Sequence, residues 1–288
     1  MFILSSLLAT LFYSLNNIFM TPHARSLDPL SVSSYRGIAI GIFMLPFSIM
    51  YFGSELFLMD KNVLLMILCA CFTTVIGNSS FYMSSRYLPV GIASGVCLGF
   101  STIFVMILDK IINNQIIHSN QYLFAMMIIF IVIMIGVSSN KKSFKELNVT
   151  KGIFYSMLFG IFLGSGYFLV GLISRQINPL IAGFYWEGGI GIIGFVIISL
   201  KSLIQRNRFH FEPQKLLVIG KAASPTILGT SFYAYATTIG PISIAAAILP
   251  LISVFTSIFA IFYLKEKLIL LQWILVGVLV FCIAMLKL

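Results

Sequence analysis

The sequence predicts an all-α integral membrane protein with ten transmembrane helices, arranged as two inverted five-helix repeats. Three observations lead to this fold class: 59% of the 288 residues are hydrophobic and 9% are charged, the apolar residues form long runs, and the two halves of the chain are similar. A typical soluble domain carries about 25% charged residues. The composition therefore excludes a soluble globule, and the abundant apolar surface excludes a disordered chain.

Ten apolar stretches of bilayer-spanning length are separated by short polar or proline-containing joints. The first stretch follows Met1 without a basic segment or a cleavage site, so we interpret it as a span and not as a signal peptide. The stretches leave little room for a soluble domain. They lie at roughly 2–21, 30–52, 62–84, 89–108, 120–139, 151–173, 179–200, 215–238, 241–263 and 268–286.

The short loops between these stretches carry an uneven distribution of Lys and Arg, which predicts the orientation in the membrane. If the N-terminus is outside, the cytoplasmic loops hold twelve of the 18 cations and the outer loops hold four, with Arg36 and Lys221 inside spans. We therefore expect both termini outside a cytoplasmic or inner membrane.

An internal repeat appears at an offset of about 150 residues. Asp28-Pro29-Leu30 opens the second span and Asn178-Pro179-Leu180 opens the seventh. Five spans in each half force the second copy to enter the membrane upside down relative to the first, as in many transporters. The predicted units are a repeat at 1–140, a cytoplasmic linker at 141–150 and a second repeat at 151–288.

Several short motifs add to this plan. Arg36 follows Pro29 by seven residues, Leu249-Pro250 lies in the ninth span, and Leu264-Lys265-Glu266-Lys267 precedes the tenth. Together with the ten-span plan, these motifs resemble the drug/metabolite transporter superfamily, in particular its EamA-like permeases. The resemblance implies a transporter of small metabolites, amino acids, nucleotide sugars or drugs, often in the outward direction.

Three ionisable residues, Arg36, Glu187 and Lys221, are predicted deep inside spans. Exposing such a side chain to lipid costs about 2.5–3.5 kcal/mol at a helix centre, so we expect all three to face a polar interior. Glu187 has two leading interpretations. It either carries a proton or binds a cationic solute, with Tyr185 and Trp186 stacking on that cation, or it forms a structural ion pair with Arg36 or Lys221.

Arg36 and Lys221 also have alternatives, because they could capture a solute anion or extend to the lipid headgroups. The eighth span shows a polar stripe at helical spacing, which we expect to line the cavity: Lys221, Ser224, Leu228, Ser231 and Tyr235. Spans 1 and 3 add polar candidates that could bind solute or only join helices: Tyr13, Asn16, Asn17, Thr74, Asn78 and Tyr82. Mid-span prolines predict kinks at Pro46, Pro225 and Pro250.

These features favour a secondary transporter that moves a small organic solute by alternating access, as an efflux permease and with proton coupling at Glu187. The alternative is uptake or exchange of an anionic metabolite held by Arg36 and Lys221, and a non-transporting receptor or scaffold is less favoured. Three scattered His and eight acids argue against an enzyme, a metal site or a cofactor. We expect the lipid bilayer and the solute as partners, no nucleic acid, and a monomer or homodimer.

Overall fold

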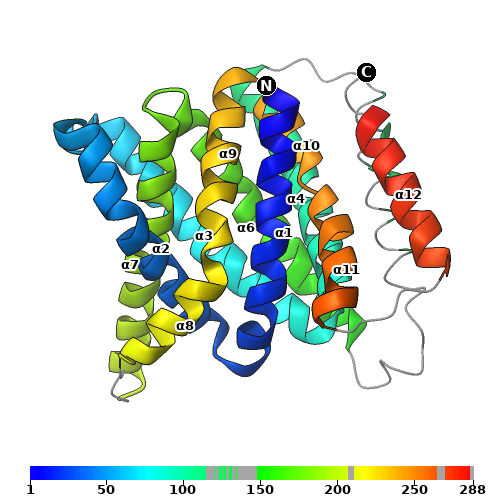
Figure 1. The fold of residues 1–288 in the computed structure, drawn as a ribbon, viewed down its shortest axis with the longest axis horizontal. Coiled ribbons are helices and arrows are strands. Elements are labelled where there is room, and N and C mark those ends of the chain that lie inside the picture. The colour runs from blue at the N-terminus through cyan, green and yellow to red at the C-terminus, as the bar shows by residue number, and fades with distance from the viewer. Residues whose placement is uncertain are drawn as a thin grey trace.

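The computed structural model describes residues 1–114, 148–206, 211–264 and 270–285, with scattered residues between 120 and 134. In these segments all regular secondary structure is helical, and there is no strand. Figure 1 shows the helices packed side by side as a bundle. The prediction of an all-helical protein is confirmed for this part of the chain.

The first four predicted spans are four long helices. Three of these helices (α1, α3 and α4) end three to five residues beyond the predicted span, because the polar residues at the joints continue the helix. Asp28 caps the second helix, since its Oδ2 accepts a hydrogen bond from the Ser31 backbone N–H at 2.9 Å, and Pro29 occupies the first turn. The helices are α1 (Phe2–Ser26), α2 (Pro29–Phe52), α3 (Lys61–Tyr87) and α4 (Val90–Asn113), with a short 3₁₀ turn η1 (Gly53–Phe57) after α2.

The second half starts with two long helices and continues with broken ones. The eighth span divides before Pro225 and the ninth divides at Pro250, because proline lacks the N–H that the preceding turn needs and its ring clashes with that turn. Pro46, by contrast, lies inside an unbroken α2. The helices are α6 (Val149–Ser174), α7 (Pro179–Ile204), α8 (Pro213–Ala223), α9 (Pro225–Ile239), α10 (Ile242–Ile248), α11 (Leu251–Tyr263) and α12 (Leu270–Met285).

Within the described segments, seven stretches are long and apolar enough to cross a membrane: α1, α2 with η1, α3, α4, α6, α7, and α10 with α11. The protein is therefore a multi-pass membrane protein. Helices α8, α9 and α12 are too short to be counted singly, at 11, 15 and 16 residues. The predicted span at 120–139 lies largely outside the described residues, so the total of ten spans stays a prediction.

Helices α2 and α7 cross at glycines. Gly37 packs against the Gly191 backbone, and a Cβ on Gly41 would lie 2.8 Å from the Gly188 Cα. Such glycines let membrane helices approach closely. Positions rise along α2 as they fall along α7, so the two helices run in opposite directions.

The halves interlock along other pairs as well, because α3 packs on α6 and α1 packs on α9. Within each half, an arginine forms an equivalent contact at a helix end, and the two arginines are 150 residues apart. Arg25 Nε donates to the Ser85 carbonyl at the end of α3, and Arg175 Nε donates to the Thr237 carbonyl at the end of α9. The similarity of the halves therefore extends from sequence to contacts.

Candidate substrate pocket

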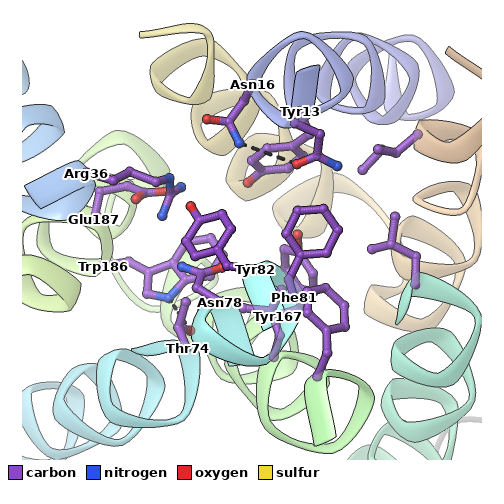
Figure 2. A pocket seen from close by; sticks show the side chains of 15 residues that line it. Tyr13, Asn16, Arg36, Thr74, Asn78, Phe81, Tyr82, Tyr167, Trp186 and Glu187 are labelled. Atoms are coloured by element: carbon purple, nitrogen blue, oxygen red, sulfur yellow. Dashed lines mark hydrogen bonds and ion pairs between the residues drawn. The ribbon is translucent and has the colours of Figure 1, made fainter. Parts of the chain in front are cut away.

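A pocket lies where the two halves meet. Its lining residues come from seven helices and include apolar, aromatic, polar and charged side chains (Figure 2). All of them except Asn17 and Asn78 are buried. The lining consists of Tyr13, Asn16, Asn17, Arg36, Thr74, Asn78, Phe81, Tyr82, Leu98, Phe159, Leu163, Tyr167, Trp186, Glu187 and Ile252.

An ion pair joins the halves at this pocket. Arg36 Nη2 on α2 lies 3.0 Å from Glu187 Oε1 on α7, and the two side chains are only 6% and 1% exposed. The neighbours of these residues in the chain, Gly37 and Gly188, belong to the close crossing of α2 and α7. The glycine contact thus brings the two charges together, and Figure 2 shows them side by side.

A directed chain of hydrogen bonds holds the Glu187 carboxylate. Thr230 Oγ1 on α9 donates to Glu187 Oε1 at 2.7 Å and also lies 3.1 Å from the Tyr13 hydroxyl on α1. A threonine hydroxyl has one proton, which goes to the carboxylate, so Tyr13 must donate to Thr230. The chain fixes Oε1 and ties α1, α9, α7 and α2 to one another.

Several buried polar atoms around the pocket have no hydrogen-bond partner among the described residues. They are Nε and Nη1 of Arg36, Oε2 of Glu187, Nδ2 of Asn78 and Oδ1 of Asn16. The large majority of buried side-chain polar atoms in proteins find a partner, so such a cluster needs an explanation. These atoms can serve as donors and acceptors for a bound molecule.

Aromatic rings form much of the wall. Trp186 Nε1 donates to Thr74 Oγ1 at 2.8 Å, and the Trp186 ring meets the Tyr167 ring edge to face with centroids 5.7 Å apart. Tyr167 also packs against Tyr13 at 6.3 Å. These contacts fix the orientation of the rings, which therefore present a preformed apolar surface.

Many of the residues selected from the sequence come together here. The structure resolves which cation pairs with Glu187, because that residue is Arg36. Beside these two, the pocket takes in Trp186, Tyr13, Asn17, Asn78 and Tyr82.

The stripe predicted on the eighth span does not line the pocket. Lys221, Ser224 and Tyr235 are exposed on the outer surface of the bundle, and Ser231 Oγ bonds to the Ile227 carbonyl of its own helix. The expectation was wrong because this face points away from the bundle: Lys221, Ser224, Leu228 and Tyr235 do share one face across α8 and α9, and all four are exposed.

The buried face of α9 carries a different set of residues, Thr226, Thr230, Tyr233 and Thr237. Thr230 is the functional candidate that the sequence reasoning missed. Its signal was present, since these four positions follow intervals of four, three and four residues, which is the spacing of one helix face.

Tyr185 and the three prolines also lie outside the lining. The Tyr185 hydroxyl donates to the Leu56 carbonyl of η1 at 2.6 Å, so this side chain is tied to η1 and is not part of the lining. Pro250 lies two residues before the lining residue Ile252. In the described segments, no three His, Cys, Asp or Glu side chains lie together as metal ligands would.

Comparison with known proteins identifies the chain. The model of the EamA-like transporter family matches residues 1–137 and again residues 150–288. The protein belongs to the EamA-like transporter family. The resemblance drawn from the motifs is therefore confirmed, and the two matches fall on the two halves of this EamA-like protein.

A solved structure titled "Crystal structure of protein" has the same fold. Its TM-score is 0.69 at 9% sequence identity, and the alignment covers 98% of the EamA-like chain and 95% of the solved chain. At this identity the likeness shows the fold alone. No curated protein matches the sequence.

Proposed function

We propose that this EamA-like protein is a secondary transporter that carries a small organic solute across the cytoplasmic membrane, with the pocket as its solute site. The observation that carries the proposal is the cluster of buried polar atoms at the interface of the two halves that have no partner in the described part of the chain. Transporters with repeated halves place their solute sites at this kind of interface.

The packing supports transport by alternating access between inverted repeats. Helices α2 and α7 are the second spans of their halves, and both begin with a capping residue followed by proline. They nevertheless run in opposite directions. Since most lining residues are buried, separation of the helices at this interface would widen the path of a solute to the pocket. The breaks before Pro225 and at Pro250 give α9 and α11 points at which to bend.

For direction and coupling, we propose export of the solute in exchange for protons. Among the described lining residues, Glu187 is the one carboxylate, and its Oε2 has no partner. A proton on Glu187 would remove the negative charge that holds Arg36. Protonation of Glu187 and binding of the solute would then both act on the ion pair between Arg36 and Glu187.

Proteoliposomes that contain a pH-sensitive dye test this coupling. Pools of amines, amino acids and nucleosides are added to the wild type, to Glu187→Gln and to a control, Glu212→Gln, which alters an exposed carboxylate paired with Lys215. We expect solute-triggered proton movement in the wild type and the control, and none in Glu187→Gln. Equal movement in Glu187→Gln would overturn its role as the proton carrier.

Nε and Nη1 of Arg36 have no partner among the residues that the structure describes, and they favour a second candidate, exchange of an anionic solute. Lys221 has no part in this candidate because it lies on the outer surface. The two candidates are separated by measuring how much a bound solute protects each variant against thermal unfolding. Loss of protection only in Arg36→Gln favours an anion, and loss only in Glu187→Gln favours a cation.

A further inference from the structure

We infer that the pocket selects a compact, net-neutral solute with an acceptor group for Arg36, a neighbouring donor group for Glu187 and a flat apolar body. The inference rests on the proposed role of the pocket as the solute site. It differs from both candidates above, because it requires the two charged residues to act together on one molecule.

The charge balance of the pocket is the first reason. Its described lining contains one cation, Arg36, and one anion, Glu187, which already neutralise each other. A buried charge without a partner is strongly unfavourable, so a solute with a single charge would leave one charge of the site uncompensated. A solute with both charges, or with neither, leaves the balance intact.

The second reason is how the pair is joined. A guanidinium and a carboxylate can form two parallel hydrogen bonds, but here Nη2 and Oε1 form a single contact. Thr230 occupies Oε1 as well, so Oε2 is the carboxylate oxygen that faces no partner among the described residues. Arg36 retains two donors, and Glu187 retains one acceptor, for the same bound molecule.

Two neutral side chains also provide one donor and one acceptor. Asn78 has a buried amide nitrogen without a partner, and Asn16 has a buried amide oxygen without one, in the part of the chain that the structure describes. The pocket therefore offers donors and acceptors of both charged and neutral kinds. A solute whose polar head group carries an acceptor and a donor close together can bond to both the donors and the acceptors of the pocket.

The third reason is the wall. Figure 2 shows the ion pair at one side of the pocket and the rings of Tyr82, Phe81 and Tyr167 across it. Aromatic side chains pack favourably against flat apolar groups in stacked or edge-to-face geometry. A solute with its polar head at Arg36 and Glu187 would therefore place a ring or another flat group against these side chains.

The chain offers a direct reporter of binding. It has two tryptophans, Trp186 in the pocket and Trp273 on α12, where it is 42% exposed. The variant Trp273→Phe leaves Trp186 as the sole tryptophan. Its fluorescence then reports solute in the pocket without any requirement for transport.

The experiment titrates this variant with four probes that share one ring and differ in charge: phenylalanine, 3-phenylpropanamide, phenethylamine and 3-phenylpropanoate. We expect phenylalanine to bind at least about tenfold more tightly than the amine or the acid, because each of those lacks one hydrogen-bonding group. The affinity of the neutral amide should fall between that of phenylalanine and those of the two singly charged probes. Its rank shows whether the pocket prefers a zwitterion or any net-neutral head group. Equal or tighter binding of the amine or the acid, or no binding of any probe, would overturn the inference.

Two charge variants sharpen the result. In the Trp273→Phe background, Arg36→Gln leaves a net negative pocket and should shift the preference toward phenethylamine. Glu187→Gln leaves a net positive pocket and should shift it toward 3-phenylpropanoate. Unchanged ranking in well-folded variants would contradict the inference, and the ranking in the parent stands without them if they fail to fold.

Flux measurements keep this inference separate from the proposed function. Selective binding of phenylalanine with no flux of any solute into proteoliposomes would refute transport and leave the selectivity intact. Flux restricted to singly charged solutes would refute the selectivity and leave transport intact.

Discussion

Arg36 on α2 and Glu187 on α7 form a buried contact of 3.0 Å, although 151 residues separate them in the chain. Gly37 and Gly188, one residue further along each helix, lie at the crossing of the same two helices. The charges and the glycines therefore form one unit, in which close packing of the halves positions the ion pair at the pocket.

This unit predicts a steric effect at the crossing. Gly191→Ala would place a Cβ against the backbone of Gly37 and Ile38, so the helices must move apart. We expect a loss of about 1–3 kcal/mol in the free energy of unfolding, measured by titration with denaturing detergent. Gly277→Ala on α12 is the control because a Cβ there meets nothing within 4 Å among the described residues, and equal stability of the two variants would contradict the packing.

Thr230 should be required for the orientation of Glu187. Thr230→Val removes the donor to Oε1 and leaves the Tyr13 hydroxyl without its acceptor, at about 1–3 kcal/mol for the buried groups left unsatisfied. We expect weaker solute binding and a lower midpoint of thermal unfolding. In the control Thr238→Val, the lost bond goes only to the Tyr235 carbonyl of the same helix. A Thr230→Val protein that binds solute like the control would show that the chain from Tyr13 to Glu187 is dispensable.

Asp109 forms a second link between the halves. It is 2% exposed, its Oδ2 accepts from the Ser243 backbone N–H at the start of α10, and its Oδ1 accepts from Asn113. Asp109→Leu leaves that N–H without its side-chain cap, so we expect a loss of about 1–2 kcal/mol. Asp109→Asn keeps an acceptor oxygen and should lose less. Unfolding in detergent measures both, and the reverse order would contradict the link.

Lys221 should have little effect on the solute. It is exposed on α8 and does not line the pocket, so Lys221→Gln should leave the affinity measured by Trp186 fluorescence within about twofold of the parent. An affinity loss as large as that of Arg36→Gln would place Lys221 at the site after all.

The sequence predicted the long helices well because each is a single apolar run with a clear start, as at Asp28-Pro29 and Asn178-Pro179. It also found the pocket residues on α1 and α3, where the helix is continuous. It failed on the eighth span, because a polar stripe shows which residues share a helix face but not whether that face points into the bundle, and the face with Lys221 and Tyr235 is exposed.

Pairing across the halves is the other limit. Three ionisable residues in spans predicted a shared interior, but their distances depend on how α2 and α7 cross. Sequence alone left both Arg36 and Lys221 open as partners of Glu187. The crossing at Gly37 and Gly191 selects Arg36, and that choice follows from tertiary packing, which has no local sequence signal.

The most direct test of the central claim is solute counterflow in proteoliposomes. Vesicles loaded with an unlabelled solute pool are diluted into the same labelled solutes, and entry of label is followed for the wild type, Glu187→Gln and the exposed-site control Glu212→Gln. If the pocket is the solute site of a transporter, label should accumulate in vesicles with the wild type and with the control. With a folded Glu187→Gln protein, accumulation should fall to the level of loaded vesicles that contain no protein. Undiminished counterflow in Glu187→Gln would contradict the claim that the ion pair forms part of the transport site.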